Sequence, residues 1–211
     1  MPVRADTQAT RQAIVAAAAE LFARHGVDAV SLGQIGRAAG QKNNSAVQYH
    51  FGDRRSILRA ILDDHVPGID ARRVQLLDAT KAPLTLRELG TILVEPVADK
   101  LDDPAGVAFV QISAQLAGHP TYPLFEFDQE ASLEGRRRLA VQVATLLPPM
   151  PGEVLLARRS LLVSLLFHGL ADYSRQPSIT PVSRQLFVNN LIDIVVANLQ
   201  TPPSPATLAC L

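Results

Sequence analysis

Apolar residues recur at helical spacing close to the N-terminus of this 211-residue chain. Ile14, Ala17, Ala18, Leu21 and Phe22 stand at positions i, i+3, i+4, i+7 and i+8, which places them on one face of an α-helix. No stretch of the sequence alternates at a period of two residues for long enough to predict a sheet. The pattern therefore predicts an all-α fold with about nine helices.

Start and stop signals divide the first part of the chain into four helices, of which the second and third are short. His25 and Gly26 end the first, because a cation favours the negative helix end and glycine adopts the left-handed conformation beyond it. Ser31 begins a second helix as the first residue of a capping box. A third helix is expected over 45–51, and Asp53 should cap a fourth.

Longer apolar segments follow Pro67, separated by breaks that contain proline. They predict helices near 69–80, 84–101, 104–118, 125–147, 152–174 and 182–199. The tail 201–211 contains three prolines and no helical pattern, so we expect it to be disordered.

Charge is unevenly distributed, although the formal net charge is zero. Residues 1–60 contain eight basic and four acidic side chains, whereas residues 61–211 contain the other twelve basic and sixteen acidic ones. A positive segment on a negative body favours a nucleic-acid contact at the N-terminal end. A ligand-independent DNA-binding protein, one alternative, would be expected to be positive throughout.

A small-molecule-processing helical enzyme is the other alternative. The cluster Asp63, Asp64 and His65 suggests a metal site, but adjacent carboxylates point to different sides of a helix. The sequence contains no Gly-rich phosphate loop, nucleophile elbow or metalloprotease motif. We therefore expect no catalytic residues, no metal and no cofactor.

The expected location is the cytoplasm. Cys210 is the only cysteine, so one chain forms neither a disulfide framework nor a thiolate metal cage. No export signal is visible at the N-terminus. Apolar stretches such as 94–98 and 160–167 are shorter than the ~20 residues that cross a bilayer, so we expect no membrane partner.

The second and third helices, joined by a turn that contains Gly40, predict a helix-turn-helix, whose second helix enters the major groove of DNA. Such helix pairs also occur as plain packing in all-α proteins. The turn and third helix gather amide, hydroxyl, phenol and imidazole groups, which bind phosphates and base edges. These groups belong to Asn43, Asn44, Ser45, Gln48, Tyr49 and His50.

Three runs within residues 8–62 resemble the DNA-binding domain of the TetR/AcrR family of transcriptional regulators. They are Thr10-Arg11-x-x-Ile14-x-x-Ala17-Ala18-x-x-Leu21-Phe22-Ala23-x-x-Gly26, Ser31-Leu32-x-x-Ile35-x-x-Ala38-Ala39-Gly40 and Tyr49-His50-Phe51-x-Asp53-Arg54. Two features depart from the family pattern: Tyr49 directly precedes His50, and Arg54 and Arg55 replace the usual lysine and glutamate. The remainder is similar to the family only in length and helicity.

The resemblance implies a ligand-responsive regulator, expected to be a repressor, that binds a double-stranded palindromic operator as a homodimer. It implies a helix-turn-helix DNA-binding domain at 1–65, a helical effector-binding and dimerisation domain at 66–200, and the disordered tail at 201–211. The implied base readers are Asn43, Asn44, Ser45 and Gln48. The implied phosphate contacts are Tyr49, His50, Arg54 and Arg55, with Lys42 adding charge and Ser31 and Gln34 near the far strand. Packing of His50 on the first helix and a capping role alone for Gln34 remain alternatives.

In the resembling family the last two helices dimerise and the helices before them enclose a small molecule. The implied dimer residues are Leu162, Leu165, Leu166, Gly169, Leu186, Phe187, Asn190, Leu191 and Ile194. Candidate effector residues form an apolar and aromatic set with a few polar groups, which favours a hydrophobic or aromatic effector. They are Phe109, Gln115, His119, Tyr122, Phe125, Phe127, His168 and Tyr173.

Overall fold

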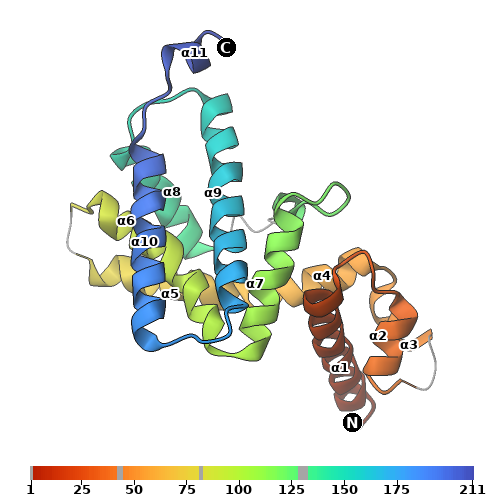
Figure 1. Cartoon of the computed structure of the whole chain (residues 1–211). Coiled ribbons are helices and arrows are strands. Elements are labelled where there is room, and N and C mark those ends of the chain that lie inside the picture. The colour runs from red at the N-terminus through yellow and green to blue at the C-terminus, as the bar shows by residue number, and fades with distance from the viewer. Residues whose placement is uncertain (1, 42–44, 81–82, 128–132) are drawn as a thin grey trace. The chain divides into compact units, whose positions relative to one another are not determined.

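The computed structural model describes residues 2–41, 45–80, 83–127 and 133–211. Every regular element in these ranges is a helix, which confirms the predicted all-α class (Figure 1). The chain forms two compact units, each described by itself below: 1–67 with 100–129, and 68–99 with 130–211. The N-terminal unit thus includes a segment, 100–129, that the family resemblance assigns to the second domain.

The first unit contains the N-terminal helices and one later helix. In chain order its elements are α1 (Pro2–His25), α2 (Leu32–Ala38), α3 (Ser45–Phe51), α4 (Arg54–Asp63), α7 (Pro104–Ala117) and the 3-10 helix η2 (Leu124–Phe127). Helix α1 packs against α2, α4 and α7. Ile14, Phe22, Ile35 and Ile57 are fully buried between these helices, as their helical spacing predicts.

Helix ends in the first unit follow the sequence signals. Helix α1 ends at His25, and Gly26 takes the left-handed conformation with φ of 94°. The Oγ of Ser31 accepts the Gln34 amide at the start of α2, and the Oδ1 of Asp53 accepts the Ser56 amide at the start of α4. The predicted caps are therefore confirmed.

The second unit is a bundle of longer helices. They are α5 (Val66–Ala79, which begins just before the unit), α6 (Leu86–Ala98), α8 (Glu134–Leu146), α9 (Gly152–Ser174), α10 (Pro181–Gln200) and α11 (Pro205–Leu208). Helix α10 packs on α6 and α9. Gly90 permits the close crossing of α6 and α10, because a Cβ there would lie 2.7 Å from Cγ2 of Val196.

Three predicted segments differ from the structure. The segment 84–101 divides into α6 and the 3-10 helix η1 (Asp99–Asp102), and Asp103 then caps α7. The segment 125–147 begins later, with η2 preceding α8. In the tail, Ser204 caps α11 and Pro205 is its first residue, so proline begins a helical turn there instead of excluding one.

Candidate DNA-binding site

Helix α3 presents polar side chains on the outside of the first unit. Val47 and Phe51, one turn apart, are buried, and this pair fixes the rotation of the helix. Ser45 and Gln48 are consequently exposed, and the side chain of Tyr49 is 83% exposed. An exposed tyrosine next to an exposed amide provides hydrogen-bonding groups for DNA at little structural cost.

His50 is half-buried beside this surface. Its ring meets the Tyr49 ring edge-on, with the two centroids 5.2 Å apart. Three other predicted DNA-contacting residues lie outside the described residues: the base readers Asn43 and Asn44, and Lys42, which is predicted to add charge. Their contacts with DNA, like those of Ser45 and Gln48, stay predictions.

Ser31 and Gln34 form the predicted capping box. The Ser31 amide donates to Oε1 of Gln34 at 2.8 Å, and the Gln34 amide donates to Oγ of Ser31 at 3.3 Å. Both side chains therefore have partners within α2, and a contact of either with DNA also stays a prediction.

Asp53 caps the start of α4. The hydrogen bond from the Ser56 amide is the main cause that lowers the pKa of Asp53 below its ordinary value. A lowered pKa means that the cap stabilises the fold above the unfolded-state pKa and is lost as pH falls through the folded-state pKa.

We expect Asp53→Ala to lower the free energy of unfolding by about 1 kcal/mol at pH 7, since α4 loses its N-cap. Urea unfolding at pH 7 and at pH 3 measures this. The difference between wild type and variant should shrink at pH 3. An equal difference at both pH values would contradict the role of the ionised carboxylate.

Arg54 is directed into the first unit. Its Nη2 donates to the carbonyl of Val30 at 2.8 Å, and Nη1 lies 3.8 Å from Oδ1 of Asp28. The side chain thereby ties the start of α4 to the turn between α1 and α2. This role has no signal in the sequence, because Asp28 and Val30 belong to no motif.

Arg55 contacts the segment that follows α7. It forms an ion pair with Glu126, its Nη2 donates to the carbonyl of Thr121 at 2.8 Å, and its guanidinium lies 5.4 Å from the Tyr122 ring centroid. Because both Arg54 and Arg55 have partners within the unit, phosphate would have to compete for them. Their predicted phosphate contacts remain untested.

Gln115 of α7 caps the end of α1. Its Oε1 accepts the Val27 amide at 2.8 Å, and its Nε2 donates to the Phe22 carbonyl at 3.1 Å. One side-chain amide thus satisfies a donor and an acceptor of the backbone at the end of α1. The sequence suggested Gln115 only as an effector residue.

His119 makes a second link to the same turn. Its Nδ1 accepts the amides of Thr121 and Tyr122, both at 3.1 Å, so the other ring nitrogen carries the proton in the neutral imidazole. That nitrogen, Nε2, lies 3.1 Å from Oδ2 of Asp28 and donates to it. Helix α7 and the residue two positions beyond its end therefore hold the turn before the helix-turn-helix at two points.

The remaining effector candidates of the first unit pack among its own helices. Phe109 is buried and stacks on His65, with the two ring centroids 4.7 Å apart. Burial of the His65 ring itself lowers the pKa of His65. Phe127 is buried beneath Arg55 and Arg59, whose guanidinium carbons lie 5.8 and 5.6 Å from its ring centroid. Phe125 is half-buried in η2.

His168 and Tyr173 belong to the second unit, so the eight predicted effector residues divide between the units. His168 is exposed, with Nδ1 3.0 Å from the carbonyl of Ser164. Tyr173 is buried and stacks on Phe187, with centroids 4.3 Å apart. Neither unit by itself brings the whole set together.

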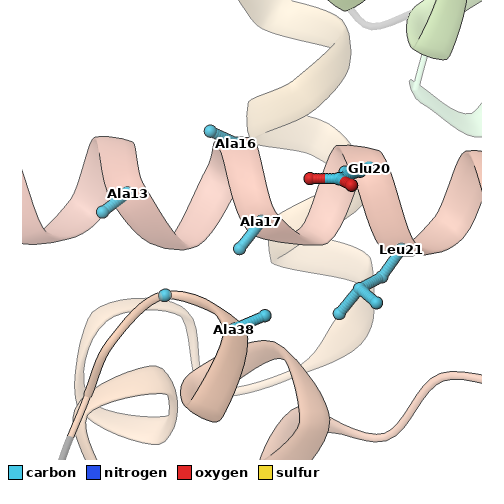
Figure 2. A pocket seen from close by; sticks show the side chains of 7 residues that line it. Ala13, Ala16, Ala17, Glu20, Leu21 and Ala38 are labelled. Atoms are coloured by element: carbon cyan, nitrogen blue, oxygen red, sulfur yellow. The ribbon is translucent and has the colours of Figure 1, made fainter.

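Helices α1 and α2 leave a shallow hollow between them, shown in Figure 2. Its lining is almost entirely small and apolar, with Glu20 as the charged member: Ala13, Ala16, Ala17, Glu20, Leu21, Ala38 and Ala39. Ala17 and Leu21, predicted as part of the buried face of α1, are therefore only partly covered.

Helices α9 and α10 expose apolar side chains in the second unit. Leu161 and Leu186 are 63% and 71% exposed, and Ile194 is 43% exposed. Of the predicted dimer residues, Asn190 is also exposed, whereas Leu191 is buried within the unit. The others are half-buried: Leu162, Leu165, Leu166, Gly169 and Phe187.

Helix α9 has the length and the apolar composition of a membrane-crossing helix. The uninterrupted apolar stretches of the sequence, such as 160–167, are shorter and did not indicate this. Only 17% of its most apolar window is buried within the chain. By themselves, length and composition are weak evidence for a membrane span, because helices of soluble proteins pass the same test. Most of the apolar surface of α9 is therefore exposed in the single chain.

An all-helical chain with an N-terminal helix-turn-helix and exposed polar groups on its second helix defines a DNA-binding regulator of transcription. Residues 14–61 match the family of bacterial regulatory proteins named tetR. Two curated relatives from Pseudomonas putida, the HTH-type transcriptional regulator SrpR and the uncharacterized HTH-type transcriptional regulator TtgW, are each 33% identical over 104 residues. Each match covers 43% of this chain, and the chain spans 48% of SrpR and 76% of TtgW.

Solved structures share the fold. NalD of Pseudomonas aeruginosa, the secondary repressor of the MexAB-OprM multidrug efflux pump, superposes with a TM-score of 0.56 at 23% identity, over 94% of this chain and 99% of NalD. AmtR of Mycobacterium smegmatis gives 0.55 at 21% identity, over 95% and 90% of the two chains. The chain belongs to the TetR family of transcriptional regulators, a family of DNA-binding proteins and not of enzymes.

Proposed function

We propose that the protein is a repressor that binds a palindromic operator as a homodimer and is released by a small hydrophobic or aromatic effector. The observation that carries this proposal is α3, which exposes Gln48 and Tyr49 while its buried residues anchor it. Footprinting on the DNA beside the protein's own gene tests the proposal. Two protected half-sites one helical turn, ~34–36 Å, apart are expected.

The homodimer is supported by the apolar surface of α9 and α10. Side chains such as Leu161 and Leu186 are left exposed in the single chain, although burying them would be favourable. A two-fold axis through this surface would pair the two helices with their copies in a four-helix interface. Light scattering at micromolar concentration should show a dimer.

Release by an effector is supported by the hydrogen bonds between α7 and the end of α1. Gln115 and His119 hold the turn between α1 and α2. A shift of α7 would therefore move this turn, and with it α2 and α3. Linkage requires that effector and operator weaken each other by the same factor. A compound that binds free and operator-bound protein equally is not the effector.

We expect Gln48→Ala to weaken operator binding by about 1.5 kcal/mol, roughly tenfold, while random duplex is bound nearly as before, because a side-chain amide reads base edges. Tyr49→Phe should weaken binding to both duplexes by similar factors, since the Tyr49 hydroxyl is predicted to contact the DNA phosphate backbone, which is the same in every sequence. Titrating both variants with operator and scrambled duplex measures this. If only Tyr49→Phe loses discrimination, the roles of these two side chains are reversed.

A further inference from the structure

The second unit contains a cluster of charged side chains where α5 meets the start of α8. Asp70 of α5 is only 5% exposed, and its two oxygens accept the amides of Gly135 and Arg136 at 2.9 and 2.8 Å. Gly135 permits this approach, because a Cβ there would lie 2.6 Å from the Asp70 carbonyl oxygen. The carboxylate of Asp70 is therefore engaged by backbone amides.

Arg73, one helical turn after Asp70, has a buried guanidinium nitrogen without a partner, although the charge of Asp70 partly offsets its burial. Its Nε is buried and has no hydrogen-bond partner, and no acidic residue among those the structure describes forms an ion pair with it. Burial, aided by the positive charge of Arg136, lowers the pKa of Arg73 to about 10. A guanidinium nitrogen withdrawn from water without a hydrogen-bond partner carries a desolvation cost.

The charge of the neighbouring Arg136 increases this cost, and that of Asp70 reduces it. Burial also lowers the pKa of Arg136, and the charge of Arg159 on α9 adds to the effect while Asp70 opposes it. Three helices thus bring positive groups to one place. A bound anion would offset the cost, and a guanidinium fork matches the planar geometry of a carboxylate.

We propose that Arg73 binds the carboxylate group of an apolar effector, at the junction of α5 and α8 in the second unit. The inference rests on the proposed function and narrows its effector to compounds with a single carboxylate. One monoanion suffices, because the buried atom without a hydrogen-bond partner in this cluster is a single one, Nε of Arg73, among the residues that the structure describes.

The test compares two carboxylates with their neutral counterparts on the full chain: sodium decanoate with 1-decanol, and sodium benzoate with benzyl alcohol. We expect at least one carboxylate, and not its alcohol, to raise Tm and weaken operator binding. In Arg73→Met the ligand-free Tm should rise, because an unpaired charge is removed, and the carboxylate should bind at least tenfold more weakly. Arg73→Lys keeps the charge without the fork and should bind with intermediate affinity.

Arg72→Met is the matched control, because Arg72 is exposed on the same helix and pairs with Asp99. It should leave the carboxylate response unchanged. A lower Tm or a failure to fold in Arg73→Met would show that Arg73 is a structural residue and would overturn the inference, as would equal effects of acid and alcohol. Loss of specific DNA binding by wild type, in contrast, would refute the proposed function itself.

Discussion

Replacing Leu186 by aspartate is expected to convert the protein to a monomer and to weaken operator binding by about 10²–10⁴-fold. In a dimer, binding of one recognition helix to its half-site raises the effective concentration of the other helix at the second half-site. A monomer binds one half-site without this gain in affinity. Leu186 is 71% exposed in the single chain, so the change should leave each chain folded. In the dimer it would bury an unpaired charge.

Light scattering and titration with operator duplex measure the two effects. Val141→Asp is the control, because Val141 is also apolar and is 59% exposed, but lies on α8. It should stay dimeric and bind the operator normally. A Leu186→Asp variant that remains dimeric would place the interface on another surface.

Replacing Gln115 by leucine is expected to lower the free energy of unfolding by about 2–3 kcal/mol, because the Val27 amide would be buried without an acceptor. The Phe22 carbonyl would still accept the Gly26 amide, so only one backbone group is orphaned. Operator binding should also weaken, because the end of α1 loses its link to α7. Urea unfolding and operator titration measure the two effects.

The matched control is Gln12→Leu, which makes the same change on the exposed surface of α1. Its effect on stability should be within about 0.5 kcal/mol. If Gln115→Leu were as mild as this control, the hydrogen bonds of Gln115 would not hold the end of α1.

Local signals in the sequence predicted the fold of the first four helices well. Caps such as Ser31 and Asp53 bind backbone groups only three residues away, so both partners fall within one short sequence motif. The buried positions of α3 were predicted for the same reason, since Val47 and Phe51 are one turn apart.

Contacts between distant segments were not predictable in this way. Gln115 is 88 residues from Val27, and His119 is 91 residues from Asp28, so neither pairing leaves a periodic or local pattern. Arg54 and Arg55 illustrate the same limit, because composition shows their charge and not the carbonyl groups they bind. The aromatic composition of the effector candidates likewise did not reveal that most of them belong to the first unit.

The recruitment of residues 100–129 to the N-terminal unit limits how this DNA-binding module can be exchanged. A chimera that joins residues 1–65 to the body of a relative would keep Asp28 and the end of α1 but would receive a foreign α7. Such a graft would have to supply a side-chain amide and an imidazole at the positions of Gln115 and His119. Recombination within the family should therefore succeed more often when the two discontinuous segments are inherited together.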